Sequence, residues 1–361
     1  MKKIMLDPGH GGRDTGAAAL GLIEKSLNLD VAKRVRGFLT GYDGLVKLTR
    51  EKDEALSADE RVAIVTAFNP DLCVSIHHNA ANGTARGSEI IHQARNKRDD
   101  QLAELIQERL QKAGMPSRRI FSKLNDQGQD WYFMIRRIAD GDTEAIIVEG
   151  GFVDNPQDAK LLKDDSFLEA EAKAIAEGII SYLKLQKLTT IAGPAEATKE
   201  EMLACVRRRN PSPKLPYCSL EELAQLYIVE GALENIRADI AWAQTLKETG
   251  AFRYGGIVLP EQNNFAGIGA LNGSKQGQAA TFETPLKGVR AQLQHLKAYA
   301  SKEDLNSTCV DPRFGLVKRG SAPYVEWLGA ANNPQGVGWA YPGESYGHDI
   351  VKILNEMLKA E

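Results

Sequence analysis

Cysteine is scarce in this 361-residue sequence, and the spacing of its cysteines excludes two kinds of site. The four cysteines are Cys73, Cys205, Cys218 and Cys309. They form no Cys-x-x-Cys pair, which excludes a zinc ribbon and a dithiol redox motif. Cys205 and Cys218 could bridge in an oxidising compartment, but free thiols are favoured for a chain without an export signal.

Long apolar runs and a dominant charge are also missing. No apolar stretch approaches the roughly 18 residues of a membrane-spanning helix. The N-terminal Met-Lys-Lys leads into a strand-like run that is too short for a secretory signal, so we expect synthesis in the cytoplasm without export by that route. The 45 basic and 48 acidic residues give a net charge of -3. No strong field therefore draws the chain to nucleic acid, and we expect neither nucleic-acid nor membrane partners.

What is present is a chain longer than one hydrophobic core usually supports, which predicts two domains. In residues 1–185, short apolar runs alternate with amphipathic stretches. The expected strands are residues 3–7, 45–50, 72–76, 88–92 and 145–149, and the expected helices are residues 25–39, 57–68, 101–113 and 167–183. This alternation predicts an α/β domain with an open, largely parallel sheet over residues 1–185.

The pattern changes near the middle of the chain. Residues 186–199 contain small residues, a Gly-Pro pair and no periodicity, which predicts a linker. Beyond it the sequence is mainly helical, with helices expected at residues 220–229, 233–249, 285–300 and 348–359. We therefore expect a second, mainly α domain over residues 200–361. Two helix starts are also expected in the first domain, at the Ser57-x-x-Glu60 capping box and at Asn155.

Polar side chains follow three of the expected strands, at the points where the strands end. These segments read DPGHGG at residues 7–12, SIHHN at 75–79 and VEGGF at 148–152. The carboxyl ends of parallel strands meet at one edge of a sheet, so we expect histidines and Glu149 to gather there, with Glu24 facing the same crevice. Strand alternation sends His77 and His78 to opposite faces. Only one of them should therefore join His10, and alternation leaves the choice open.

Two imidazoles, a carboxylate and one open position are the parts of a catalytic zinc site. A further carboxylate is needed there to carry a proton. Each residue alone has a simpler interpretation, because His10 could be a turn histidine and either glutamate a salt-bridge partner. The combination at one sheet edge favours the metal site.

These segments, together with Glu24, resemble the zinc-dependent N-acetylmuramoyl-L-alanine amidases of bacterial and phage cell-wall lysis, over roughly residues 2–183. The resemblance implies that His10, Glu24 and His77 bind Zn²⁺ and that Glu149 is the catalytic carboxylate. It also implies hydrolysis of the amide between the muramoyl lactyl group and the L-alanine of the stem peptide. The family often has a small or polar residue at the position of His78 and Thr or Ser at that of Gly150. Neither departure touches an implied ligand.

In the second half, Glu248 occupies the last turn of an expected helix that stops at Gly250. The helix dipole disfavours an anion there, so a partly buried carboxyl would keep its proton, as a glycosidase general acid requires. From the position alone, a solvated glutamate is the simpler interpretation.

The segments around Glu248 resemble the autolysin and flagellar-type N-acetylglucosaminidases, which have a lysozyme-like, mainly α fold. The resemblance covers about residues 202–356 and rests on residues 243–250, 263–269, 288–299 and 311–314. It implies that Glu248 is the general acid. Glu283, 35 residues further on, is a candidate second catalytic group, although some members rely on the acetamido group of the substrate. The candidate sugar-stacking aromatics are Trp242, Tyr254, Trp327 and Trp339, although core packing is the commoner use of such residues.

Together these features predict a bifunctional peptidoglycan hydrolase that cuts both the stem peptide from the sugar and the glycan strand. Two such activities without an export signal are typical of a phage endolysin, which would act on the cell wall after release from the host cytoplasm. Two alternatives remain for the second domain. It could be a wall-binding module without activity, or a muramidase that cuts the other glycosidic bond.

Overall fold

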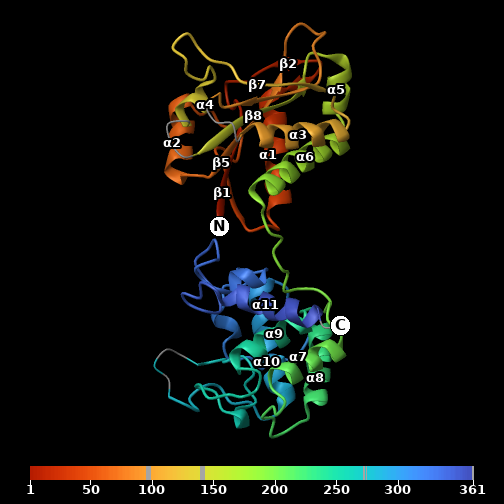
Figure 1. Cartoon of the computed structure of the whole chain (residues 1–361), viewed down its shortest axis with the longest axis vertical. Coiled ribbons are helices and arrows are strands. Elements are labelled where there is room, and N and C mark those ends of the chain that lie inside the picture. Colours follow the sequence, from red (N-terminus) through yellow and green to blue (C-terminus); the bar gives the residue numbers. More distant parts are fainter. Residues whose placement is uncertain (95–98, 139–142, 271–272, 274, 360–361) are drawn as a thin grey trace. The chain divides into compact units, whose positions relative to one another are not determined.

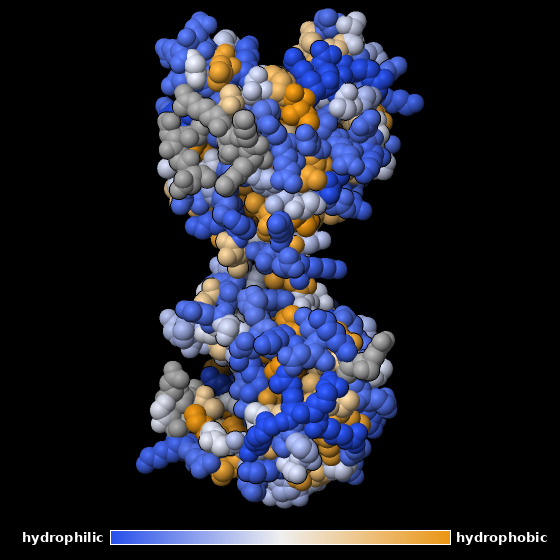
Figure 2. All heavy atoms as spheres, viewed as in Figure 1, coloured by the Kyte–Doolittle hydropathy of each residue, from blue (hydrophilic) through white to orange (hydrophobic). Residues whose placement is uncertain are grey.

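The computed structural model describes residues 1–94, 99–138, 143–270, 273 and 275–359. The chain divides into two compact units, Met1–Lys187 and Leu188–Glu361 (Figure 1). Each unit has its own hydrophobic core, and hydrophilic residues cover most of the visible face of each in Figure 2. Within the described residues, every helix is too short or too polar to cross a membrane.

The first unit is built on a six-stranded sheet with the order β4-β1-β5-β8-β6-β7. All neighbouring strands are parallel except β6 and β8, which are antiparallel. The strands are β1 (Lys2–Pro8), β4 (Gly44–Leu48), β5 (Leu72–Asn79), β6 (Ser88–His92), β7 (Ser117–Phe121) and β8 (Glu144–Phe152). The predicted largely parallel α/β sheet is therefore confirmed.

Helices cover both faces of this sheet (Figure 1). The helices α1 (Glu24–Leu39), α3 (Asp99–Lys112) and α6 (Asp165–Leu183) pack together on one face, and α2 (Ala58–Phe68) and α4 (Phe133–Ile138) pack on the other. Side chains on each strand alternate between these two layers. On β5, Val74 and Ile76 face the first layer and Cys73 faces the second.

Two smaller elements lie at the carboxyl ends of the strands. A hairpin of β2 (Ala18–Ala19) and β3 (Leu22–Ile23) leads directly into α1, and α5 (Pro156–Leu162) follows β8. The predicted helix starts are confirmed, because Ser57 and Glu60 form a reciprocal capping box and the Asn155 side chain caps α5. The sequence does not predict β7, because its exposed Ser-Arg-Arg start lacks an alternating apolar pattern.

The second unit is mainly helical, and α9 lies at its centre. Residues 238–246 of α9 are all buried, and the helix packs against four others. The elements are α7 (Lys199–Arg209), α8 (Leu220–Glu234), α9 (Ala238–Glu248), α10 (Pro285–Ala300), α11 (Tyr346–Leu358) and the 3-10 turns η1 (Pro260–Gln262), η2 (Phe314–Leu316) and η3 (Val325–Leu328).

The sequence misplaces one helix break in this unit. The expected helix over residues 233–249 is wrong at its start, because α8 runs on to Glu234 and stops at Asn235, whose φ of 54° is left-handed. Residues 186–199, predicted as a linker from composition, include the fully buried Ile191 and reach into α7, because Thr198 caps this helix and Lys199 is its first residue. All four cysteines are free.

Candidate metal centre and a second acidic site

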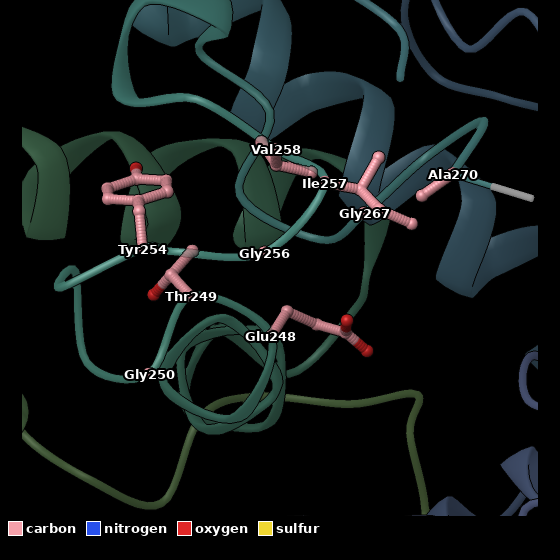
Figure 3. Close-up of a pocket in the computed structure, with 9 residues that line it drawn as sticks. All are labelled: Glu248, Thr249, Gly250, Tyr254, Gly256, Ile257, Val258, Gly267 and Ala270. Atoms are coloured by element: carbon pink, nitrogen blue, oxygen red, sulfur yellow. The ribbon is translucent and has the colours of Figure 1, made fainter. Parts of the chain in front are cut away.

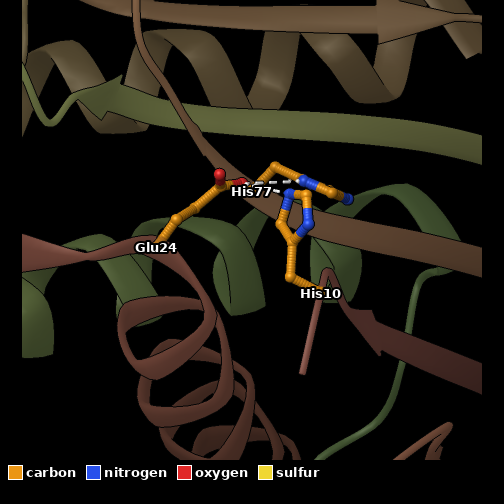
Figure 4. A group of neighbouring side chains, drawn as sticks. All are labelled: His10, Glu24 and His77. Carbon is orange, nitrogen blue, oxygen red and sulfur yellow. Dashed lines mark hydrogen bonds and ion pairs between the residues drawn. The ribbon is translucent and has the colours of Figure 1, made fainter. Parts of the chain in front are cut away.

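Three of the residues singled out in the sequence converge at the carboxyl edge of the sheet. Glu24 Oε1 lies 3.1 Å from Nε2 of His10 and 2.9 Å from Nδ1 of His77 (Figure 4). One ligand atom from each residue lies within 4.8 Å of the others, so the group could hold a metal ion. Two imidazoles and a carboxylate suit Zn²⁺ and leave a position open for water or substrate.

Two glycines make this convergence possible. A Cβ on Gly9 would lie 2.1 Å from the ring of His77, and a Cβ on Gly16 would lie 2.4 Å from Glu24 Oε2. Gly16 also has a φ of +62°, which L side chains rarely adopt. The loop after β1 therefore brings His10 beside Glu24, the first residue of α1, only because these positions carry no side chain.

A second layer of hydrogen bonds fixes two of the ligands. Asp14 Oδ2 lies 2.8 Å from Nδ1 of His10, which leaves Nε2 as the nitrogen that faces the site. Glu24 accepts a hydrogen bond at Oε2 from the backbone N–H of Ala17 at 2.8 Å, and one at Oε1 from Asn28 Nδ2 at 3.3 Å. The ligand atoms are thus oriented by groups that hold no metal themselves.

The charges within this group stabilise one another. Burial alone would raise the pKa of Glu24, but hydrogen bonds from His10 and His77 hold it well below its usual range. The hydrogen bond to Glu24 raises the pKa of His10 to about 9. A metal ion would therefore displace a proton from the imidazole of His10 on binding. An ionised carboxylate between two histidines is a donor set that fits Zn²⁺.

Glu149, on β8, lies beside the group formed by His10, Glu24 and His77. It is in register with His77 on the neighbouring β5, and its Oε2 is buried without a hydrogen-bond partner among the described residues. Burial raises the pKa of the Glu149 carboxyl, against the charge of His77, which lowers it. A carboxyl with an unpartnered oxygen beside a metal site is suited to carry a proton.

His78 points to the opposite face of the sheet, as strand alternation predicts. Its ring is buried in the α1, α3 and α6 layer, with Nε2 3.3 Å from Glu171 Oε1 and Nδ1 2.8 Å from Asn28 Oδ1. Burial alone would lower the pKa of His78, but the charge of Glu171 raises it. His77, and not His78, therefore joins the ligand group.

Sequence reasoning missed Glu89, which the structure places opposite Glu149. The two residues are in register on the antiparallel strands β6 and β8, and Glu89 is almost fully buried. Asn79, which follows the two histidines, donates from Nδ2 to Glu89 Oε2 at 3.1 Å. No sequence motif marks this pairing, because it depends on the register of strands that are distant along the chain.

The second unit has a cavity of about 330 Å³ at the C-terminal end of α9. Glu248 projects into it from the last turn of the helix (Figure 3), and the remaining lining residues are Thr249, Gly250, Tyr254, Gly256, Ile257, Val258, Gly267 and Ala270. The hydroxyl of Tyr254 is buried without a partner among the described residues. The cavity is therefore lined by one carboxyl group and by the Tyr254 side chain, whose hydroxyl is itself enclosed in the protein.

A chain of buried hydrogen bonds ends on Glu248. Gln292 Nε2 donates to Gln244 Oε1 at 2.9 Å, Gln244 Nε2 donates to Tyr346 Oη at 2.9 Å, and Tyr346 donates to Glu248 Oε1. Glu248 Oε2 faces Gly267, where an added Cβ would lie 3.2 Å away. Burial raises the pKa of Glu248, and the Tyr346 hydrogen bond lowers it. Because Oε1 accepts the hydrogen bond from Tyr346, Oε2 is the oxygen of this carboxyl that remains without a hydrogen-bond partner in the described part of the chain.

Apart from Tyr254, the other residues predicted for this unit do not line this cavity. Glu283 is exposed, forms an ion pair with Lys287 that lowers its pKa, and is not among the cavity-lining residues. Trp242 is fully buried in the core, so of the two uses considered for it, core packing is the one that the structure shows. Trp327 and Trp339 are partly buried against the same core, which leaves Tyr254 as the predicted aromatic that lines the cavity.

Comparison with known proteins relates the chain to cell-wall amidases. Residues 4–181 match the N-acetylmuramoyl-L-alanine amidase family. An uncharacterized protein of Borreliella burgdorferi is 43% identical over 148 residues, which are 41% of this chain and 68% of that protein. The endolysin of Bacillus phage SPP1 is 34% identical over 206 residues, 55% of this chain and 72% of the endolysin.

The N-acetylmuramoyl-L-alanine amidase LytC of Bacillus subtilis is 35% identical over 188 residues, 50% of this chain and 35% of LytC. The matched family region, residues 4–181, contains the ligand group and Glu149. Through this region, the chain belongs to the N-acetylmuramoyl-L-alanine amidase family.

Proposed function

We propose that the first unit is a zinc-dependent hydrolase that cuts the amide between the muramoyl lactyl group and the L-alanine of the stem peptide. The observation that carries this proposal is the convergence of His10, Glu24 and His77 beside the unpartnered Oε2 of Glu149. When bound, Zn²⁺ supplies a Lewis acid that polarises a carbonyl and lowers the pKa of water.

The residues of the chain then have separate tasks. Asp14 and Asn28 hydrogen-bond to His10 and Glu24 and would hold these two side chains in place as ligands of the ion. Glu149 takes a proton from the attacking water at Oε2 and later gives it to the amine that leaves. Burial raises the pKa of Glu149 above the ordinary value of a glutamate, which favours proton uptake by this carboxyl when it acts as base.

Glu149→Gln tests this assignment. Amide cleavage should fall by at least about 100-fold, the usual contribution of a general base, while zinc remains bound because Glu149 is not a ligand. Mass spectrometry of purified peptidoglycan digests would measure the free stem peptides, and metal analysis would measure zinc per chain. Zinc loss in this variant, or unchanged release of peptides, would contradict the assigned role.

We also propose that the second unit cuts the glycan strand as an N-acetylglucosaminidase, with Glu248 as general acid. This proposal is supported by the cavity, by the raised pKa of Glu248, and by the hydrogen bond from Tyr346 to Oε1, because this bond keeps Oε2 free to face the cavity. Among the described residues that line the cavity, Glu248 alone has a carboxyl group. We therefore favour assistance by the acetamido group of the substrate over a role for the distant Glu283.

The ends of the digested glycan distinguish this activity from its alternatives. Reducing N-acetylglucosamine ends that disappear in Glu248→Gln, by at least about 100-fold, would support the assignment. Reducing N-acetylmuramic acid ends would make the unit a muramidase, and intact strands would make it a wall-binding module. A chelator should abolish release of stem peptides and spare the cleavage of glycan.

The combined activities are those of a bifunctional peptidoglycan hydrolase. The relative from phage SPP1 is named an endolysin, and we propose the same role for this chain, acting on the cell wall after release from a host. Glycan strand and stem peptide would then be its partners.

A further inference from the structure

Four polar side chains form a row across the sheet beside the metal centre. His77 on β5 is in register with Glu149 on β8, Glu149 with Glu89 on β6, and Glu89 with Arg119 on β7. Residues paired in this way point to the same face of the sheet, and neighbouring strands lie about 4.8 Å apart. The row therefore runs from the ligand group, past the proposed proton carrier, to an arginine.

A bulge adds a second arginine to the end of this row. The register between β6 and β7 shifts between Ser88, which pairs with Ser117, and Glu89, which pairs with Arg119. Arg118 is the extra residue, and bulges beside active sites commonly redirect a side chain. Glu89 Oε1 consequently accepts hydrogen bonds from Nε of both arginines, at 2.6 Å from Arg118 and 2.8 Å from Arg119.

The arginine pair carries more positive charge than its buried partner requires. The Glu89 side chain is 3% exposed, whereas those of Arg118 and Arg119 are 41% and 53% exposed. Both guanidiniums hydrogen-bond to the one carboxylate of Glu89, so neither has a carboxylate of its own among the described residues and both are partly open to solvent. The terminal nitrogens of Arg118 have no hydrogen-bond partner in the described part of the chain.

Both guanidiniums are also held in place before any ligand arrives. Arg119 lies over the ring of Phe121 at 4.0 Å, and Arg118 over that of Phe152 at 5.4 Å. Side chains fixed by stacking and by a buried carboxylate lose little conformational freedom on binding. A planar, fixed pair of guanidiniums recognises a carboxylate through paired N–H groups.

We infer that Arg118 and Arg119 bind a carboxylate of the stem peptide, on the side of the substrate that leaves as the amine. This inference rests on the proposed amidase function. Two strand spacings place the backbone of Arg119 about 10 Å from that of Glu149. Two extended peptide residues span about 7 Å, so the carboxylate of the second stem residue lies within reach of an arginine side chain.

Two synthetic substrates that differ in one group test the inference. N-acetylmuramoyl-L-alanyl-D-glutamine has a free α-carboxylate at the second residue, and N-acetylmuramoyl-L-alanyl-D-glutaminamide has a neutral amide in its place, while the γ-carboxyl is an amide in both. The wild-type chain should cleave the acid with a kcat/KM roughly 10- to 100-fold higher, the range expected for hydrogen bonds between charged groups. The double variant Arg118→Gln and Arg119→Gln should lose this preference through a higher KM for the acid, with the amide little changed.

Arg137→Gln is the matched control, because it removes an exposed arginine of the same unit that pairs with Asp59 on α2. It should keep the preference for the acid. Equal cleavage of both substrates by the wild type would overturn the inference. An equal loss on both substrates in the double variant would also overturn it, because the arginines would then serve only to support Glu89.

Failure of the amidase proposal would appear differently, as a wild-type chain that cleaves neither substrate. Calorimetric titration with free L-alanyl-D-glutamine, whose α-carboxylate is free, and L-alanyl-D-glutaminamide, whose two carboxyls are both amides, then decides the inference without activity. Preferential binding of the acid, lost in the double variant, supports it, and equal binding of the two dipeptides overturns it.

Discussion

Gly150 makes room for the buried pair of His78 and Glu171 next to the metal centre, because it has no side chain. A Cβ on Gly150 would lie 1.9 Å from Glu171 Oε1 and 2.9 Å from Nε2 of His78. The resemblance to the amidases implies Thr or Ser at this position in many members, and either would exclude the buried pair. His78, Glu171 and Gly150 therefore depend on one another, and through Asn28 they contact the carboxylate of Glu24.

Glu171→Ala should destabilise the first unit strongly. It leaves His78 buried without its counter-charge, and breaking a buried pair in this way costs about 3–5 kcal/mol of unfolding free energy. The urea dependence of amide hydrogen exchange in β5 would measure this for the first unit alone. The control Glu169→Ala removes an exposed partner of Arg34 on the same helix and should cost less than about 1 kcal/mol.

A second variant tests whether the loss of stability comes from the unpaired charge of His78. Replacing both members, His78→Ala with Glu171→Leu, removes the buried charges together and should recover part of the loss, because apolar replacements for a buried pair are often neutral. A double variant less stable than Glu171→Ala would contradict the view that unpaired charge causes the loss.

Single residues of the metal centre could be recognised in the sequence because each lies at or just after the end of an expected strand or begins a helix. His10, Glu24, His77 and Glu149 all lie at one sheet edge, and the structure brings them together. Glu89 could not be recognised, because its position opposite Glu149 is set by an antiparallel pairing and a bulge that leave no local pattern.

Among the elements, the C-terminal end of α9 determines the position and the surroundings of the Glu248 carboxyl. Its buried residues fix Glu248 in the last turn, and Tyr346 at the first position of α11 donates to Oε1. This hydrogen bond favours the carboxylate and lowers the pKa that burial raises. The two helices together therefore set the pH range in which Glu248 stays protonated.

Tyr346→Phe should move the pH profile of glycan cleavage in a defined direction. A general acid acts while protonated, so activity is present below the pKa of Glu248 and is lost as the pH rises through it. Removing the hydrogen bond raises this pKa, and the loss should therefore occur at higher pH than in the wild type. The pH dependence of kcat/KM for release of reducing ends would measure it. A shift to lower pH would contradict the assigned donor.

Elements with strong periodicity were predictable, whereas their boundaries depended on tertiary contacts. The capping box at Ser57 and the strands of the sheet interior follow from local pattern. The break between α8 and α9 does not, because Gly231 lies inside α8 and the helix stops later, at Asn235. A side chain does not fit at Gly231, because a Cβ there would lie 2.8 Å from the carbonyl oxygen of Ile236.

At the scale of the whole molecule, two units with separate cores contain sites of different chemistry. The metal centre lies wholly in residues 1–187 and the Glu248 cavity wholly in residues 188–361. Ligand binding stabilises only the structure that forms the site. Zinc should therefore stabilise the first unit and leave the second unchanged.

Calorimetric unfolding of the full chain, with zinc and with a chelator, tests this separation. Zinc at 100 times its Kd should add about 2.7 kcal/mol to the stability of the first unit, so one transition should move to higher temperature while the other stays in place. The Glu24→Ala variant, which lacks a ligand, should show no shift with zinc. Two transitions that move together would mean that the units unfold as one, and chelation would then impair both proposed activities through stability alone.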